Sequence, residues 1–245
     1  MLSMTTTEET LSTGIREIAG ALGGGVREES LVIIEGEDNS GKSVLSQHLA
    51  YGTLSHKNNA VVYYTIDNSA ECLIAQMESM SLDVAHDFAT DRLRIYAVGS
   101  SNVLEKAQET LGLLINHISH LPVRFNLVVV DSVTALMTRN RPVDKIDFLK
   151  SCKELCEQDR SIILVADTHI FERDTLARAY SISDYYLKLK SQDMLLETGQ
   201  LDSRAIKVLG VTKLCGAERL AQEDIKFEIK PKIGIQILPF LKVRV

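Results

Sequence analysis

The sequence contains no tryptophan, only four cysteines and four prolines, and 5% aromatic residues among 245. So few cysteines do not make a disulfide framework in a chain of this length, and they suit a reduced cytoplasm. Basic charge is not in excess, because 27 Lys and Arg stand against 33 Asp and Glu. No apolar run approaches the ~20 residues needed to cross a bilayer. These absences argue against a secreted disulfide-rich protein, a membrane-spanning chain and a protein that wraps nucleic acid.

The N-terminal stretch MLSMTTTEET has neither a basic region nor an apolar region, so it does not match a secretion signal. We expect residues 1–11 to be a flexible tail. Residues 12–245 contain no internal repeat and no low-complexity tract, and their number suits one large α/β domain.

A phosphate-binding loop is the clearest motif that is present. Residues Gly36–Ser43 have the sequence GEDNSGKS, after the apolar run Leu31–Glu35 and before a helical pattern. Glycines at both ends let successive N–H groups turn toward phosphate oxygens, and the helix adds its positive N-terminal end. We expect Lys42 to reach the β- and γ-phosphates and the Ser43 hydroxyl to ligate Mg²⁺. The residues of the loop expected to hold the nucleotide are Gly36, Asp38, Asn39, Ser40, Gly41, Lys42, Ser43 and Val44.

Strand-like and helical patterns alternate after this loop, which predicts an α/β fold with a mainly parallel sheet covered by helices on both faces. The expected strands are 31–35, 60–66, 93–98, 126–131 and 161–167, and the expected helices are 15–22, 42–54, 68–79, 103–121 and 145–158. From residue 184 onward, apolar and polar residues alternate, which predicts antiparallel strands at one edge of the sheet. These strands are expected at 185–190, 204–214, 225–229 and 234–238, with 192–203 as a loop.

Two further strand ends carry polar residues. Asp131 ends the apolar run Leu127–Val130 in the Walker B arrangement, where its carboxylate can hold Mg²⁺ through water. A strand-ending aspartate can also simply cap the next turn, but the strong loop upstream favours the Mg²⁺ role. His169 follows the strand that ends at Asp167, where a γ-phosphate sensor would lie. A polar strand exit is an equally good interpretation of His169.

Hydrolysis requires a group that orients or deprotonates the attacking water. RecA-type folds place a glutamate for this purpose at the end of the strand after the phosphate-loop helix. The only acid at that point here is Asp67, which is one methylene shorter. A displacement of ~1 Å can lower a rate about 10²-fold. The sequence therefore predicts nucleotide binding, with weak or absent hydrolysis.

Metal-ligand spacing is not evident elsewhere. Cys152 and Cys156 are four residues apart on an expected helix, which is typical of small apolar core residues; a metal or redox pair is the alternative. The histidines other than His169 form no ligand pattern, and we expect them on solvent-facing helix positions.

Several segments together carry a family resemblance. They lie at 13–14, 22–25, 34–52 and 127–136, in the strand that leads to His169, and at 207–240. The phosphate loop alone specifies only a superfamily, whereas SVLSQHLAYG after it and the later GIQILPF are much narrower. Together they resemble the KaiC-like branch of the RecA superfamily, and most closely its archaellum accessory family, FlaH (also called ArlH).

The resemblance implies a cytoplasmic, RecA-like ATP-binding protein of the archaeal motility machine, located at the inner face of the membrane only through its partners. It implies a homo-oligomeric ring, a hexamer, that docks onto the assembly ATPase FlaI beneath the membrane platform FlaJ. By position, Lys42 and Ser43 would hold the phosphates of ATP and Mg²⁺, Asp131 would be the Walker B acid, and Asp67 would occupy the catalytic-acid region.

One part of the family pattern is incomplete. KaiC-like rings place a Lys-x-Arg pair from a neighbouring subunit on the bound phosphates, and here the segment is Lys213-Leu214-Cys215. The lysine is present and the arginine is not. An arginine finger can contribute 10³–10⁵ in rate, so its absence argues against hydrolysis activated by a neighbour. Lys213 is either an ATP sensor across an interface or a solvated strand lysine.

The leading hypothesis is an ATP-dependent regulator whose oligomer or partner contacts change with nucleotide. The alternative is an active KaiC-like ATPase or autokinase that uses Asp67 as a base. A RecA-like DNA-binding filament is the weakest hypothesis, because the composition is acidic and no basic loop carries interleaved aromatic residues.

Overall fold

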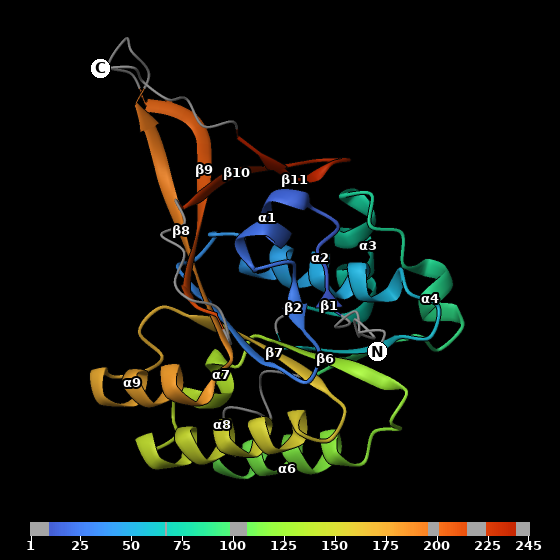
Figure 1. The fold of residues 1–245 in the computed structure, drawn as a ribbon, viewed down its shortest axis with the longest axis vertical. Coiled ribbons are helices and arrows are strands. Elements are labelled where there is room, and N and C mark those ends of the chain that lie inside the picture. Colours follow the sequence, from blue (N-terminus) through green and yellow to red (C-terminus); the bar gives the residue numbers. More distant parts are fainter. Residues whose placement is uncertain (1–9, 67, 99–106, 196–200, 215–223, 239–245) are drawn as a thin grey trace, which may run out of the picture.

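The computed structural model describes residues 10–66, 68–98, 107–195, 201–214 and 224–238. Within these residues, nine strands form one sheet between two layers of helices (Figure 1). The strands of this sheet are β3 (Leu31–Gly36), β4 (Ala60–Thr65), β5 (Leu93–Ala97), β6 (Phe125–Asp131), β7 (Ser161–Asp167), β8 (Tyr185–Leu195), β9 (Leu201–Lys213), β10 (Ile225–Lys230) and β11 (Gly234–Ile237). Their order is β11-β10-β9-β8-β3-β7-β6-β4-β5. A separate two-stranded sheet pairs β1 (Thr10–Leu11) with β2 (Val26–Arg27).

The sheet is parallel from β8 through β3, β7, β6 and β4 to β5. The pairs β8–β9, β9–β10 and β10–β11 are antiparallel. Every residue of β3 and β4 is buried, as expected of apolar strands covered on both faces. The predicted α/β fold, with a mainly parallel sheet and antiparallel strands at its C-terminal edge, is confirmed.

Two helix layers cover the sheet (Figure 1). One contains α1 (Arg16–Ala21), α2 (Lys42–Leu54), α3 (Ala70–Ser79) and α4 (Ala85–Ala89), and the other contains α6 (Ala107–Ser119), α7 (Thr134–Met137), α8 (Pro142–Cys156) and α9 (Arg173–Ile182). Alternate residues of β3 face the two layers: Val32 and Ile34 pack with α2, whereas Leu31 and Ile33 pack on the side of α8. No helix of the described residues is both long and apolar enough to cross a membrane.

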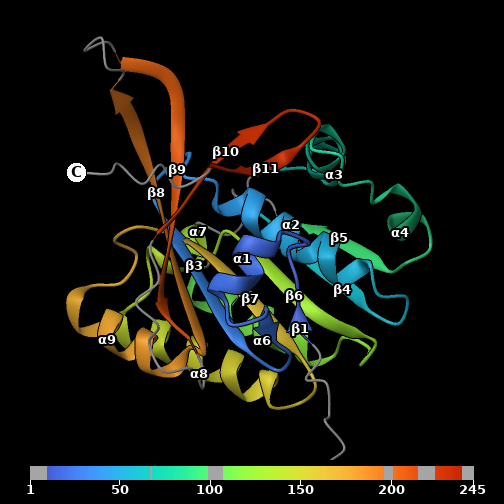
Figure 2. The same cartoon turned by 45° about the horizontal axis from the view of Figure 1, so that its top comes forward.

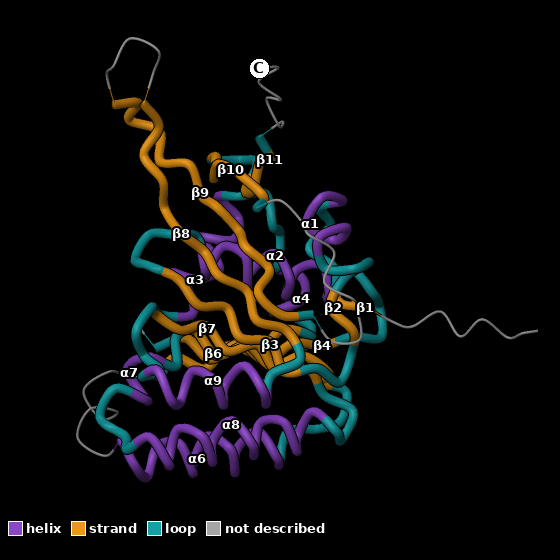
Figure 3. The backbone as a smooth tube through the Cα atoms, turned by 60° about the vertical axis from the view of Figure 1, so that its left-hand side comes forward, coloured by secondary structure: helices purple, strands orange, loops and turns teal. Residues whose placement is uncertain are grey.

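The predicted loop at 192–203 is wrong for residues 192–195 and 201–203, and residues 196–200 lie outside the described ranges. β8 extends to Leu195 and β9 begins at Leu201, with Leu195 paired to Leu201 and Met194 to Asp202. Figures 1 and 3 show that the outer part of this hairpin extends beyond the helix layers. Backbone pairing needs no apolar alternation where a strand leaves the core, so the usual sequence signal for a strand is missing there.

Smaller differences concern the N-terminus and short helices. Thr10 and Leu11, assigned to the tail, form β1, and Leu11 is only 1% exposed because it packs into the core beside α2. The helices α4, α7 and α9 were not expected from the pattern. Residues 103–106 of one expected helix lie outside the described ranges.

A C-terminal hairpin, β10–β11, covers the helix that follows the phosphate loop (Figure 2). The backbone N–H of Ile235 donates to His48 Nε2 on α2 at 3.3 Å. The backbone N–H of Lys232 donates to the carbonyl of Ser79 at the end of α3 at 2.7 Å. As a result α2 is buried both against the sheet and against this hairpin, and His48 is 5% exposed instead of facing solvent as predicted.

Candidate nucleotide-binding site

The phosphate loop connects the end of β3 to the first turn of α2. Gly41 adopts a φ of 93°, in the left-handed region, immediately before the helix begins at Lys42. The first N–H groups of a helix have no intrahelical partner, and no side chain of the described residues caps α2. The helix therefore presents unpaired donors and the positive end of its dipole at the loop, which is a favourable arrangement for an anion.

Both glycines of the loop are in close contact with other parts of the chain. A Cβ on Gly36 would lie 2.6 Å from the carbonyl oxygen of Leu189 and 2.6 Å from Ser40 Oγ. A Cβ on Gly41 would lie 3.1 Å from Ile229 Cδ1 on β10. Both glycines therefore lie against strands from the C-terminal part of the sheet, where a side chain would be crowded.

The other loop residues differ in exposure. Asp38 and Asn39 are exposed, and Asn39 has a φ of 57°. Ser40 Oγ is buried and has no hydrogen-bond partner among the residues that the structure describes. Its hydroxyl lies next to Gly36, and its backbone N–H donates to the carbonyl of Glu37 at 3.2 Å. Val44 is 7% exposed and packs in the core.

The Lys42 ammonium lies inside the loop, and the Lys42 side chain is 9% exposed. It donates to the carbonyl oxygens of Gly36 at 2.9 Å and of Glu37 at 2.7 Å. It also forms an ion pair with Asp167 Oδ1, at the end of β7, at 2.9 Å. β7 pairs directly with β3, with Asp167 opposite Gly36, and this register brings the carboxylate to the loop.

Asp131, at the end of β6, lies next to Ser43. Ser43 Oγ donates to Asp131 Oδ1 at 3.1 Å, and Tyr63 OH, from β4, donates to Asp131 Oδ2 at 2.7 Å. Ser46 Oγ on α2 lies 2.9 Å from the same tyrosine oxygen. Burial, and then the charge of Asp131, raise the pKa of Tyr63 well above its usual range, so the phenol keeps its proton.

This arrangement fits a magnesium ion. Mg²⁺ usually binds one or two protein oxygens together with phosphates and several waters. The hydroxyl of Ser43 and the carboxylate of Asp131 provide such oxygens at the N-terminus of α2. No cluster of three or more His, Cys, Asp or Glu suitable for a metal occurs within the described ranges, so the protein groups there form no complete metal cage of their own.

Two further predicted site residues, His169 and Lys213, lie on segments outside the phosphate loop, and two others lie outside the described structure. His169 is exposed and has a φ of 75°, two residues beyond the aspartate that contacts Lys42. The Lys213 ammonium donates to the carbonyl oxygens of Tyr180 at 2.6 Å and of Ser181 at 3.1 Å, and also to that of Ser183, at the C-terminal end of α9. Asp67 and Cys215 lie outside the described residues.

Sequence reasoning missed two polar residues of the site. Tyr63 belongs to a continuous apolar run, where a phenol is easily taken for core, and only its position on the α2 face of the sheet brings it to Asp131. Asp167 is the last residue of β7, at the start of the polar segment from which the sequence analysis selected His169. The direct pairing of β7 with β3, which no local pattern encodes, selects Asp167 for contact with Lys42.

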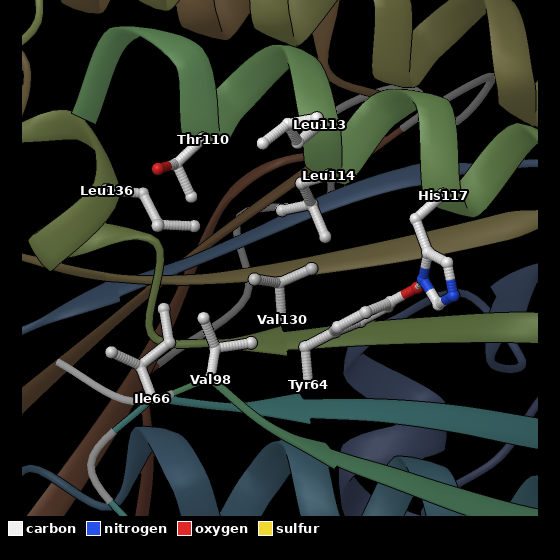
Figure 4. A pocket seen from close by; sticks show the side chains of 9 residues that line it. All are labelled: Tyr64, Ile66, Val98, Thr110, Leu113, Leu114, His117, Val130 and Leu136. Carbon is white, nitrogen blue, oxygen red and sulfur yellow. Dashed lines mark hydrogen bonds between the residues drawn. The ribbon is translucent and has the colours of Figure 1, made fainter. Parts of the chain in front are cut away.

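On the opposite face of the sheet, the ends of β4 and β6 carry apolar side chains. A cavity of about 190 Å³ lies between the sheet and α6 (Figure 4). Its floor includes Ile66 and Val130, and at one end Tyr64 OH lies 2.6 Å from His117 Nδ1. The residues that line it are Tyr64, Ile66, Val98, Thr110, Leu113, Leu114, His117, Val130 and Leu136.

Cys152 and Cys156 belong to α8 and point into the core, and both are 0% exposed. Burial raises the pKa of Cys156 to about 12 and that of Cys152 well above its usual range, so both thiols are protonated. This placement supports the interpretation of the pair as apolar core.

A phosphate loop that runs from a central parallel strand into an uncapped helix, with a strand-end acid beside its serine, defines a P-loop nucleotide-binding protein of RecA-like fold. The sequence model of the family described as "ATPase: KaiC" matches residues 11–242. The chain therefore belongs to the KaiC ATPase family.

Two curated relatives are similar over most of their length. The archaeal flagellar ATP-binding protein FlaH of Sulfolobus acidocaldarius is 25% identical over 232 residues, which cover 94% of this chain and 96% of that protein. FlaH of Methanocaldococcus jannaschii is 26% identical over 225 residues, covering 88% and 89%. The crystal structure of the flagellar accessory protein FlaH from Methanocaldococcus jannaschii superposes with a TM-score of 0.75 at 22% identity, over 95% of this chain and 100% of that one. The predicted resemblance to FlaH is confirmed, and the structural match shows the shared fold.

Proposed function

We propose that the chain is an ATP-binding regulatory or assembly protein of the archaellum motor, which binds Mg-ATP with weak or no hydrolysis. ATP would favour one oligomeric or partner-binding state because it binds that state more tightly. The names of the two full-length relatives support the assignment to the archaeal flagellum.

The observation that carries the proposal is the convergence of three groups at the start of α2. The uncapped helix end, the buried ammonium of Lys42 and the Ser43–Asp131 pair all lie at the carboxyl edge of the sheet. Together they supply what a magnesium-bound triphosphate needs: backbone donors, a cation and oxygen ligands for the metal.

Weak hydrolysis is proposed from the sequence around this centre. Asp67 stands where a glutamate is expected, and Cys215 stands where the family carries an arginine. Either replacement removes a group that can contribute orders of magnitude to the rate of phosphate transfer.

A hexameric ring that engages the assembly ATPase FlaI and the platform FlaJ at the inner face of the membrane is the proposed context. In such a ring, Lys213 would reach the nucleotide of a neighbouring subunit. It would first have to leave the carbonyl oxygens at the end of α9 that hold it in the single chain. His169 is proposed to lie beside the γ-phosphate.

Calorimetric titration with Mg-ATP, paired with light scattering of the chromatographed protein, tests the proposal. Lys42→Ala is expected to abolish both ATP binding and ATP-dependent assembly. Lys150→Ala provides the control. Lys150 is an exposed lysine on α8, and its substitution removes the same charge at a position away from the site. Unchanged assembly in the Lys42 variant would show that ATP is not the switch, and mass spectrometry of the purified protein would show whether ATP or ADP is bound.

The second candidate is an active ATPase or autokinase, favoured by the description of the family that the chain matches. Steady-state phosphate release separates the two functions. Turnover well above background that is lost in Asp67→Asn would replace the regulator proposal with an enzymatic one.

A further inference from the structure

The Lys42 ammonium has a full set of acceptors among the protein's own groups. An ammonium carries three N–H donors. Three oxygens lie within 2.9 Å of Nζ: the carbonyls of Gly36 and Glu37 and the carboxylate of Asp167. A phosphate oxygen can therefore become a partner of this lysine only when one of the three leaves.

Asp167 is the partner that can leave at the lowest cost. The two carbonyls belong to the phosphate loop itself, so releasing them would require a change in the loop backbone. The Asp167 side chain is 39% exposed, whereas that of Lys42 is 9% exposed. The Asp167 backbone is fixed separately, because its N–H donates to Thr134 Oγ1 at 2.9 Å. A rotation of the side chain alone would free the ammonium and leave β7 in place.

We propose that Asp167 is an internal competitor for phosphate: its carboxylate neutralises Lys42, and a nucleoside polyphosphate displaces it on binding. This inference rests on the proposed function, since it concerns how the same site takes its ligand. After displacement, the carboxylate remains attached to the strand beside the loop, near the negative charges of the nucleotide. Like charges a few ångströms apart repel, so the competitor lowers affinity both by holding the lysine and by opposing the phosphates.

The structure predicts a gain of affinity when this carboxylate is removed. Asp167→Asn keeps the size of the side chain and removes its charge, and Asp167→Ala removes the side chain. Both variants should bind Mg-ATP about tenfold more tightly than the unaltered chain, because a close charge interaction in a partly buried site is of this order or larger. Stopped-flow mixing with a fluorescent ATP analogue should show faster association, since the ion pair no longer has to open.

Asp147→Asn is the matched control. Asp147 is an exposed aspartate on α8 whose carboxylate pairs with Lys150, and the substitution removes the same unit of charge from the surface. Its affinity for Mg-ATP should stay within about twofold of the unaltered chain. Circular dichroism and the melting temperature without nucleotide establish that each variant is folded.

Three outcomes decide the matter. Tighter binding in both Asp167 variants, with no change in Asp147→Asn, supports the competitor. Unchanged or weaker binding in the Asp167 variants overturns it, and weaker binding would instead make Asp167 a ligand of the nucleotide complex. If Mg-ATP binds neither the unaltered chain nor any variant, the proposed function itself fails, and this result is distinct from the other two.

Discussion

The hydroxyl of Tyr63 joins the acid at the end of β6 to the helix behind the phosphate loop. It donates to Asp131 Oδ2 at 2.7 Å and is in hydrogen-bond contact with Ser46 Oγ on α2. Without this hydroxyl, Asp131 keeps its bond to Ser43 but loses the hydrogen bond that Tyr63 donates to Oδ2. Tyr63 is therefore a positioning residue for the proposed magnesium site.

Tyr63→Phe is expected to weaken the magnesium-dependent part of ATP binding about fivefold, which corresponds to one hydrogen bond of ~1 kcal/mol. Titrations of Mg²⁺ at fixed ATP measure this. Tyr64→Phe is the control, since the next tyrosine bonds to His117 on the opposite face of the sheet. If the two variants lost magnesium-dependent affinity for ATP equally, the loss would come from a change in β4 and not from the missing hydrogen bond to Asp131.

Gly41 is required by conformation and by space. Its φ of 93° is unfavourable for any side chain, and a Cβ would meet Ile229 at 3.1 Å. Gly41→Ala is expected to lower the free energy of unfolding by about 1–2 kcal/mol and to weaken ATP binding. Chemical denaturation and calorimetry measure the two effects.

Gly112→Ala makes the same substitution inside a helix, where the opposite effect on stability is expected, and serves as the comparison. A Cβ on Gly112, in α6, has no atom within 4 Å among the described residues. Alanine is a better helix former than glycine, so this variant should gain about 1 kcal/mol. A loss in Gly112→Ala as large as in Gly41→Ala would contradict the conformational argument.

At the level of elements, the hairpin β10–β11 is linked to α2 through His48. Burial lowers the pKa of His48 below its ordinary value of 6.5, and its Nε2 accepts the N–H of Ile235. Only the neutral ring has a free nitrogen lone pair, so protonation would place two N–H groups face to face.

Acidification should therefore loosen this hairpin. The unfolded chain, with the ordinary pKa of 6.5, takes up the proton more readily than the folded chain does. The stabilisation is thus complete above pH 6.5 and is lost as the pH falls from there toward the lowered pKa of the folded state. The loss can reach about 1.4 kcal/mol per pH unit in this window.

Melting temperatures between pH 7.5 and 5.5 provide the measurement. His48→Gln retains an acceptor that does not titrate, so its stability should fall less over this range than that of the unaltered chain. Parallel pH profiles for the two proteins would exclude His48 as the cause.

The bounds of most helices and strands could be predicted from the sequence. Which strands lie next to one another in the sheet could not. The bounds of α2 and β7 follow from local patterns: an apolar strand, a glycine-lysine helix start and a helical spacing of core residues. The length of β8 and β9 was missed, because the hairpin leaves the core and carries no alternation. In the same way the phosphate loop was evident locally, whereas the Lys42–Asp167 pair depends on the register of two strands far apart in sequence.

For the molecule as a whole, ATP should act as a stabilising ligand. A ligand present at 100 times its Kd stabilises the folded state by about 2.7 kcal/mol. For a domain of this size, that corresponds to a rise in melting temperature of about 5–10 °C. Thermal unfolding with Mg-ATP should show this shift.

Removal of the metal should reduce the shift. EDTA, or the substitution Ser43→Ala in the presence of Mg²⁺, is expected to lower it by a similar amount, because both remove the link between Asp131 and the phosphates. Ser55→Ala, an exposed serine at the other end of α2, is the control. A full shift in EDTA would mean that the nucleotide is held without the metal.

The contact of Gly41 with Ile229 has a consequence for how the protein is made. The phosphate loop leaves the ribosome about 190 residues before β10, the strand that packs against Gly41. A nascent chain that ends before β10 lacks the hairpin that covers α2. It also lacks the contact between Ile229 and Gly41 of the phosphate loop. We therefore expect the ability to retain nucleotide to arise only after β10 and β11 have emerged from the ribosome.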